Sequence, residues 1–480
     1  MNTTKRTKIV ATLGPATGSK EKIREIIELG VNVARINFSH GTHESNGQII
    51  DYVKELRQEM GMAVGIMADL QGPRIRTVVD EDVEIEKGER IYVYDSSVEK
   101  SEILNPEIKI VGLDWPGIVA DIEIGNDILI EDGLLRINVV EKGDNYLVAK
   151  VEDGGVVKNH KGVNIPDAKL KIGAVTEKDE VDLKFALGKG VDFVALSFVA
   201  NAAEIIATRE KIKKMLGRDE QIPLIVSKIE RKEAIKNIVE IIKATDAVMV
   251  ARGDLGIEME ESKVVIYQKE IISRCLRNAT PVIVATQMLN SMIENPRPTR
   301  AEVSDVSNAV IDHTDSVMLS GETANGKYPA EAVRVMRDII LKTEKSPFDI
   351  LAHGFLGDKS HTVSAAIAHS AHELLKDTNS KAIVAASTSG FSARMVARHR
   401  PDRPVWVMTN NESVHYQMSL VWGVETFVLP ECRTLDELID RSIDTLLKNN
   451  LVEPKERVII VAGRPGALRE HMSLVKVEEV

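Results

Sequence analysis

Charged and polar side chains follow several short apolar segments of this 480-residue chain. Lys228 and Glu230 end one such segment, and Asp254 follows the next one along the chain. Two carboxylates can hold a Mg²⁺ ion whose remaining ligands are water and phosphate oxygens. A lysine beside them can neutralise the charge that develops during phosphoryl transfer. These residue types therefore favour anion chemistry supported by a hard divalent metal.

Further polar residues end other apolar segments. Arg35, Asn37 and Ser39 share one face of an extended segment, because side chains alternate between the two faces of a strand. Thr286 and Ser320 follow two later segments. A polar sheet edge or a solvated ion pair would explain any one of these residues alone. Together they indicate a common site.

The apolar segments alternate with amphipathic stretches of helical length, which is typical of βα units and a parallel sheet. The pattern predicts an α/β protein built on an eight-stranded (β/α)₈, or TIM, barrel, whose function collects at the carboxyl ends of the strands. An open doubly wound sheet is the alternative that the pattern leaves open. The expected strands are 8–13, 33–38, 64–70, 193–198, 224–229, 247–251, 282–286 and 316–319.

Residues 71–167 differ from the rest, because period-2 alternation and Gly-containing turns replace the helical pattern. The sequence predicts an all-β insertion without a helix there. Residues 1–70 and 168–345 then amount to roughly 250 residues, the usual length of a (β/α)₈ barrel. Residues 346–480 alternate again between the two patterns, and we expect a separate C-terminal α/β domain.

The loop at residues 387–392 (STSGFS) follows an expected strand of the last domain and opens a helix. Thr388, Ser389, Gly390 and Ser392 could form a phosphate cradle from hydroxyls and backbone N–H groups. The pattern alone favours a simpler explanation, which is a capped βα turn.

Composition argues against several classes of protein. The net charge of −11 argues against a nucleic acid or an anionic membrane as the main partner. Apolar runs reach only strand length, so we expect no membrane span, and the N-terminus lacks the apolar core of a signal peptide. Cys275 and Cys432 are the only cysteines, which argues against a disulfide scaffold and a Cys-ligated zinc site. We expect a cytoplasmic protein.

The sequence resembles the pyruvate kinase family along essentially its full length. The resemblance is specific because many motifs occur in a fixed order. It implies a catalytic barrel, a mobile β-barrel lid, a regulatory C-terminal domain and a homotetramer. The matching segments are 8–15 (KIVATLGP), 34–41 (ARINFSHG), 69–73 (DLQGP), 161–166 (KGVNIP), 227–230 (SKIE), 249–256 (MVARGDLG), 285–289 (ATQML), 298–305 (PTRAEVSD) and 319–324 (LSGETA).

The resemblance implies phosphoryl transfer from phosphoenolpyruvate to ADP, which gives pyruvate and ATP. Arg35 and Lys228 match the residues that hold and neutralise the phosphoryl group. Glu230 and Asp254 match the ligands of Mg²⁺, with Mn²⁺ as a possible substitute, and Asp254 also borders the substrate.

Other roles follow from the same resemblance. Gly253 and Thr286 match the residues that receive the substrate carboxylate, and Thr286 and Ser320 match those that relay a proton to the enolate. The family binds phosphorylated effectors at the loop that corresponds to residues 387–392, so the resemblance implies an allosteric effector here. The positions on the nucleotide side are matched by His40, Arg76 and Lys161.

Asn37, Ser39, Asp69 and Leu70 match the positions of a K⁺ site in relatives that require this ion. Those relatives carry a glutamate where this chain has Arg74. A fixed guanidinium supplies the positive charge that K⁺ otherwise brings and repels a bound cation. We therefore expect that K⁺ is not required.

Two other functions compete with this interpretation. One is a Mg²⁺-dependent barrel lyase or aldolase that acts on pyruvate enolates. The β insertion argues against it, because Arg76 and Lys161 suit a second phosphorylated substrate. The other is a degenerate barrel that senses sugar phosphates, against which the intact Lys228, Glu230 and Asp254 argue.

Overall fold

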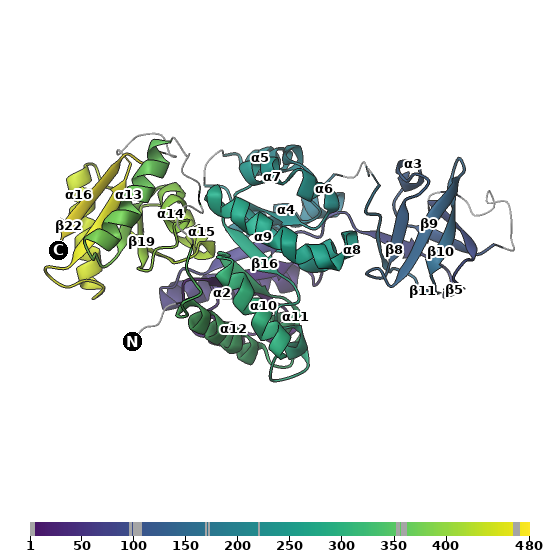
Figure 1. Ribbon diagram of the computed structural model, residues 1–480, viewed down its shortest axis with the longest axis horizontal. Helices are drawn as coiled ribbons and strands as arrows, with labels where there is room; N and C mark the ends of the chain where they lie inside the picture. Colours follow the sequence, from purple (N-terminus) through teal and green to yellow (C-terminus); the bar gives the residue numbers. More distant parts are fainter. Residues whose placement is uncertain are drawn as a thin grey trace.

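Figure 1 shows three bodies in a row, with an all-β domain at one end, a large barrel in the middle and an α/β domain at the other end. In the described ranges, no helix combines the length and apolar character that crossing a bilayer demands. The structure is a computed structural model that describes residues 5–95, 98, 108–168, 170, 173–218, 221–351, 356, 362–463 and 471–480.

Eight parallel strands close into the central barrel in the order β1-β17-β16-β15-β14-β13-β3-β2. The predicted (β/α)₈ barrel is confirmed. The alternative, an open doubly wound sheet, is wrong because β1 pairs in parallel with both β2 and β17. The strands are β1 (Lys8–Leu13), β2 (Val33–Asn37), β3 (Gly65–Asp69), β13 (Phe193–Leu196), β14 (Leu224–Ile229), β15 (Ala247–Ala251), β16 (Val282–Ala285) and β17 (Ser316–Leu319).

The helices of the barrel surround these strands, and several begin at side chains that accept a backbone N–H. Ser19 caps the first helix, and Thr42, Thr176 and Thr299 form capping boxes. The helices are α1 (Lys20–Glu28), α2 (His43–Met60), α4 (Glu177–Gly188), α5 (Ala202–Leu216), α6 (Lys232–Lys236), α7 (Ile238–Ala244), α8 (Arg252–Glu258), α9 (Glu261–Arg277), α10 (Arg300–Ile311), α11 (Gly321–Ala324) and α12 (Pro329–Glu344), with the 3₁₀ turns η1 (Pro15–Thr17) and η3 (Asn290–Ile293).

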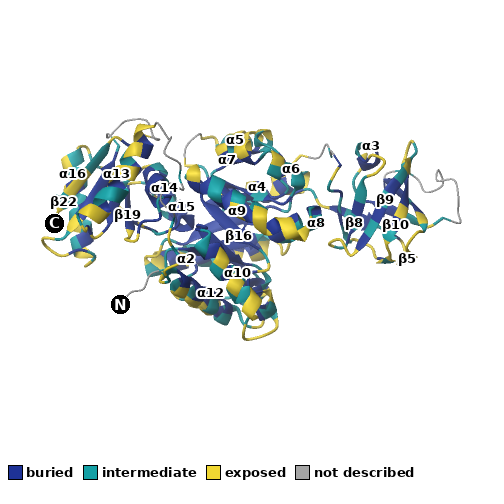
Figure 2. Ribbon diagram, viewed as in Figure 1, coloured by how far each residue is buried: buried dark blue, intermediate teal, exposed yellow. Residues whose placement is uncertain are grey.

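Apolar side chains fill the barrel and the layer between its strands and helices. Val10, Met67, Phe193 and Met249 belong to the inner cluster. A larger cluster joins the outer faces of the strands to the helices, so the strands are buried on both faces (Figure 2). The strands are thus held rigidly, and the polar residues at their carboxyl ends have fixed positions.

The inserted domain is a second closed barrel, in the order β10-β6-β7-β4-β12-β8-β9, with a small sheet of β5 and β11 beside it. The expected absence of a helix is wrong, because α3 (Ile118–Asp121) forms one turn. Four residues are too few to show a helical period. The strands are β4 (Ile75–Val78), β5 (Val83–Ile85), β6 (Arg90–Asp95), β7 (Ile110–Leu113), β8 (Asp127–Ile130), β9 (Leu135–Lys142), β10 (Tyr146–Asp153), β11 (Gly155–Val157) and β12 (Gly162–Asn164).

The C-terminal domain has one sheet in the order β20-β19-β18-β21-β22, in which only β22 runs antiparallel to its neighbour among the described strands. Helices accompany the sheet, as the alternation predicts. The elements are β18 (Ile383–Ala386), β19 (Val405–Thr409), β20 (Val424–Val428), β21 (Arg457–Ala462), β22 (Leu474–Glu479), α13 (Val363–Asp377), α14 (Phe391–Ala397), α15 (Glu412–Gln417), η4 (Met418–Leu420) and α16 (Leu435–Lys448).

Candidate active site

Lys228 lies at the end of β14, and its ammonium group is the centre of a buried ion cluster. Its Nζ lies 2.8 Å from a carboxylate oxygen of Glu230 and 3.4 Å from one of Asp69. The other Asp69 oxygen accepts a hydrogen bond from Arg35 Nε at 2.6 Å. The carboxyl ends of β2, β3 and β14 thus bring together the cations and carboxylates that the sequence predicts at one mouth of the barrel.

The opposite charges in this cluster stabilise the ionised forms of its side chains. Burial alone would lower the pKa of Lys228, but the carboxylates of Asp69 and Glu230 outweigh it and raise the pKa above its usual value. Burial alone would raise the pKa of Asp69, but Arg35 and Lys228 hold it below its usual value. Lys228 therefore stays protonated and Asp69 ionised at neutral pH, so two fixed cations face any anion that enters.

Glu230 and Asp254 follow the neighbouring strands β14 and β15, and their carboxylates are close enough to interact. Burial raises the pKa of Glu230 to about 7, against the opposing effect of Lys228 and with the help of repulsion from Asp254. Phe198 donates its N–H to Glu230 Oε2 at 2.7 Å, which orients this carboxylate. Within the described residues, no group of three or more His, Cys, Asp and Glu side chains could hold a metal ion. The donor set fits Mg²⁺, which commonly takes one or two protein carboxylates and fills its shell with water and substrate oxygens.

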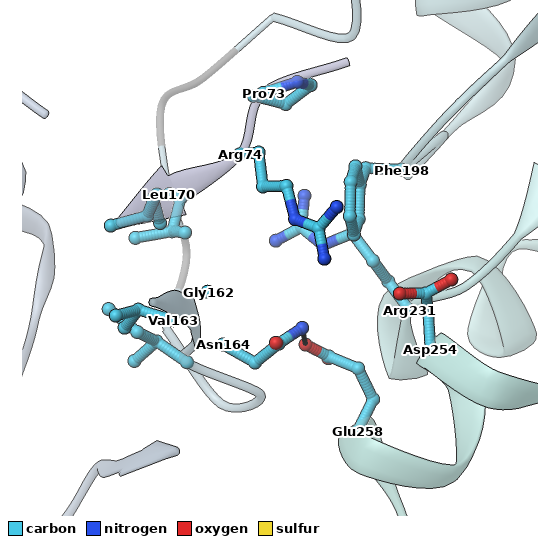
Figure 3. Close-up of a pocket in the computed structure, with 12 residues that line it drawn as sticks. Pro73, Arg74, Gly162, Val163, Asn164, Leu170, Phe198, Arg231, Asp254 and Glu258 are labelled. Carbon is cyan, nitrogen blue, oxygen red and sulfur yellow. Dashed lines mark hydrogen bonds between the residues drawn. The ribbon is translucent and has the colours of Figure 1, made fainter. Parts of the chain in front are cut away.

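A pocket lies between the two barrels, and Asp254 forms part of its lining. Figure 3 shows the Asp254 carboxylate and the Arg74 guanidinium pointing into the same space. Asn164 of the inserted domain donates to Glu258 Oε1 of α8 at 3.4 Å across the cavity. The cavity therefore has walls from both domains, so a closing lid would enclose a ligand bound at Asp254.

Gly253 and Thr286 lie together at the ends of β15 and β16. The Gly253 N–H donates to Thr286 Oγ1 at 2.8 Å, and Arg252 donates to the Thr286 carbonyl at 2.7 Å. Thr286 has a φ of 68°, which is rare for a β-branched residue and indicates a constrained position. The Ser320 hydroxyl is buried and has no hydrogen-bond partner among the described residues, so it is available to a ligand or water.

The predicted nucleotide-side residues lie on two domains. Arg76 on β4 and Lys161 next to β12 are neighbours in the inserted barrel, where Gly162 pairs with Arg76. Arg76 donates to the His160 carbonyl at 3.1 Å, and Lys161 forms an ion pair with Glu131. His40 lies on the exposed loop after β2 of the central barrel.

The positions that correspond to a K⁺ site offer few free oxygens. The Asn37 side-chain oxygen accepts the Ser39 N–H at 3.1 Å. The two Asp69 carboxylate oxygens already contact the side chains of Arg35 and Lys228. The Leu70 side chain is buried and apolar. Arg74 is exposed at the start of the inserted domain and lines the cavity with Asp254.

The loop at residues 387–392 lies between β18 and α14, as the sequence predicts. Gly390 has a φ of 77° and caps α14, and a Cβ there would lie 2.4 Å from Met418. The Ser389 hydroxyl accepts the Phe391 N–H at 3.5 Å, and Ser392 is buried. Thr388 lies between these residues and the strand end.

Several residues that position the site were not predicted from the sequence. Lys228 donates to Ser197 Oγ at 2.8 Å, and Arg35 donates to Thr12 Oγ1 at the same distance. Glu322 accepts the Ser320 N–H at 2.7 Å. Ser197 and Thr12 are polar residues at or near the ends of expected strands. The same feature, a polar residue at a strand end, indicated Lys228 and could have indicated them as well.

Comparisons with known proteins agree with this site. Residues 4–333 match a family model described as the barrel domain of pyruvate kinase, and residues 365–478 match its alpha/beta domain. Pyruvate kinase from Geobacillus stearothermophilus is 41% identical over 482 residues, which cover 99% of this chain and 80% of the relative. Pyruvate kinase from Clostridium perfringens is 38% identical and is covered completely, together with 99% of this chain.

A crystal structure of a pyruvate kinase from Cryptosporidium parvum has the same architecture. It superposes with a TM-score of 0.91 at 34% identity and covers 99% of this chain and 96% of its own. These matches do not favour the lyase, aldolase or sensor functions. They extend over the barrel and the C-terminal domain alike, and the chain belongs to the pyruvate kinase family of phosphotransferases.

Proposed function

We propose that this protein transfers the phosphoryl group of phosphoenolpyruvate to ADP and releases pyruvate and ATP. The observation that carries the proposal is the buried cluster in which Lys228 and Arg35 share Asp69. Phosphoryl transfer depends mainly on positioning and on neutralising charge, and two fixed cations at the barrel mouth supply both. The relatives named pyruvate kinase support the same reaction.

In the proposed reaction, an oxygen of the ADP β-phosphate forms a bond to phosphorus while the bond from phosphorus to the enol oxygen breaks. The electron pair of the broken bond stays with the pyruvate enolate. Arg35 and Lys228 donate hydrogen bonds to the transferring group, whose charge spreads over three equatorial oxygens. Because that charge is greatest in the transition state, these contacts lower the barrier more than they strengthen substrate binding.

Glu230 and Asp254 would hold Mg²⁺, with Mn²⁺ as a substitute, since these two interacting carboxylates follow the neighbouring strands β14 and β15. A bound divalent ion supplies Lewis-acid neutralisation of phosphate and enolate oxygens. Arg74 supplies a further positive charge at the same cavity, and K⁺ is not required.

The enolate must receive a proton at carbon. The Gly253 N–H and Thr286 would hold the substrate carboxylate, which fixes the enolate in one orientation. The Ser320 hydroxyl would pass the proton through water, because a hydroxyl alone is a weak acid. Its free hydrogen-bonding capacity in the structure supports this role.

The remaining roles rest on the family resemblance. His40, Arg76 and Lys161 would contact the nucleotide phosphates once the inserted domain closes as a lid. Thr388 and its loop, residues 387–392, would bind a phosphorylated effector. The family further implies a homotetramer in the cytoplasm.

One assay tests the proposal. The purified protein is given phosphoenolpyruvate and ADP, with and without Mg²⁺, and pyruvate and ATP are both measured. We expect equal amounts of the two products and none without a divalent ion. Pyruvate without ATP, or products of carbon–carbon cleavage, would show that the reaction is a different one.

A further inference from the structure

A short segment of the C-terminal domain closes the floor of the barrel. Figure 1 shows α15 on the barrel side of its domain, and the 3₁₀ turn η4 (Met418–Leu420) follows it directly. Leu420 is 1% exposed and belongs to the apolar cluster inside the barrel. Among the described residues of that cluster, Leu420 is the one that comes from outside the barrel. We call residues 416–420 the floor plug.

Hydrogen bonds fix the floor plug to the barrel at two points. Ser316, which begins β17, donates its hydroxyl to the Leu420 carbonyl at 3.0 Å. The side chain of Gln417 donates to the Ile222 carbonyl at 3.0 Å, in the loop that precedes β14. The floor plug therefore keeps one position beneath the strands.

The strand β3 connects the floor plug to the ion cluster at the barrel mouth. A Cβ on Gly65, at the foot of this strand, would lie 2.5 Å from Ser419 Oγ, so the backbone of β3 contacts the floor plug closely. Met67 belongs to the same inner cluster as Leu420. Asp69 ends the strand on the same face as Met67, because side chains alternate between the two faces.

Asp69 lies about 13 Å along the strand from Gly65, at about 3.3 Å per residue. Its carboxylate accepts a hydrogen bond from Arg35 Nε at 2.6 Å and lies 3.4 Å from Lys228 Nζ. A close-packed interior transmits a displacement and does not absorb it. We propose that Leu420 is a positioning residue, which supports β3 from the floor and thereby sets where Asp69 holds Arg35 and Lys228.

A simpler explanation is that Leu420 only adds buried apolar area. It would then be equivalent to any other buried leucine of its domain. Leu446 on α16 is 0% exposed and belongs to a cluster whose described members all come from the C-terminal domain. Leu446→Ala removes the same atoms as Leu420→Ala without touching the barrel, so it is the matched control.

The floor plug also contacts the loop at residues 387–392. Met418, the first residue of η4, is the neighbour that a Cβ on Gly390 would meet at 2.4 Å. The loop and the barrel floor therefore contact the same short turn. The proposal needs no effector, because Leu420 supports β3 whether the loop is occupied or empty.

The test measures ATP formation by the full-length wild type, Leu420→Ala, Leu420→Met and Leu446→Ala, at a temperature where circular dichroism shows all four folded. The effect on turnover rests on the proposed phosphoryl transfer. We expect Leu420→Ala to lower kcat about 10-fold, since a small displacement of the ion cluster weakens its contacts with the transferring group. The KM for ADP should stay nearly unchanged, because the lid residues that would contact the nucleotide do not touch the floor plug.

Two comparisons separate positioning from stability. Leu420→Met should restore kcat to within about twofold of the wild type, because the exchange conserves volume. Leu446→Ala should lower the Tm as Leu420→Ala does and keep the full kcat. Equal kcat values in Leu420→Ala and Leu446→Ala would overturn the proposal.

A crystal structure of Leu420→Ala tests the proposal without relying on activity. We expect Met67 to move toward the vacated space and the separation of Asp69 and Lys228 to exceed the present 3.4 Å. An unchanged ion cluster would overturn the proposal. A wild type that forms no ATP would instead refute the proposed function, and the crystal structure would still test the floor plug. If Leu420→Ala does not fold, the smaller truncation Leu420→Val replaces it in both measurements.

Discussion

The charge of Arg74 makes a specific prediction about monovalent cations. K⁺-requiring relatives carry a glutamate at this position, so Arg74→Glu changes the local charge by two units. One unit charge at 4 Å is worth about 1 kcal/mol in water and about 4 kcal/mol at an effective dielectric constant of 20. Arg74 is exposed, so the lower value applies. Two units then amount to about 2 kcal/mol, or roughly 30-fold in K⁺ affinity.

We therefore expect the wild type to be active in Mg²⁺ buffer without K⁺, and KCl to stimulate it less than about twofold. Arg74→Glu should lose activity in that buffer and recover part of it with K⁺. Lys87→Glu is the control, since it makes the same change of charge at an exposed turn of the lid. The assay is the initial rate of pyruvate formation at fixed ionic strength. A wild-type enzyme that is silent without K⁺ and strongly activated by it would refute the reasoning.

Three further predictions concern other parts of the molecule. Asp254→Asn should raise the Mg²⁺ concentration needed for half-maximal rate at least tenfold with the fold intact by circular dichroism, and an unchanged requirement would place the metal elsewhere. Phosphorylated metabolites should no longer shift the phosphoenolpyruvate saturation curve of the double variant Thr388→Glu, Ser389→Glu, while its basal rate should stay unchanged. A shift that survives the double substitution would exclude the loop as the effector site. Burial lowers the pKa of His399 to about 3, so the folded state binds fewer protons than the unfolded state. The unfolding free energy should fall by up to about 1.4 kcal/mol per pH unit below the unfolded pKa near 6.5, and by less in His399→Gln.

The sequence was sufficient to predict the barrel because its strands are buried on both faces and read as continuous apolar runs. The predicted strand 33–38 differs from β2 (Val33–Asn37) by one residue. The start of the C-terminal strand β20 (Val424–Val428) is harder to predict, because exposed Glu425 interrupts its apolar pattern. Strand ends are where packing, and not periodicity, sets the boundary.

The cluster of Lys228 and Glu230 could be predicted because both residues end one strand. The contact of Lys228 with Ser197 could not, since it depends on how neighbouring strands are aligned in the closed barrel.

The most direct test of the central claim measures phosphoryl transfer in Lys228→Met. Lys228 lies 2.8 Å from Glu230 and 3.4 Å from Asp69, where it would meet the transferring group. The account predicts that the rate of ATP formation falls by at least about 1,000-fold while the apparent affinity for phosphoenolpyruvate changes much less, because the contact is strongest in the transition state. Protonation of added enolpyruvate should survive. A Lys228→Met enzyme that forms ATP at close to the wild-type rate would contradict the account.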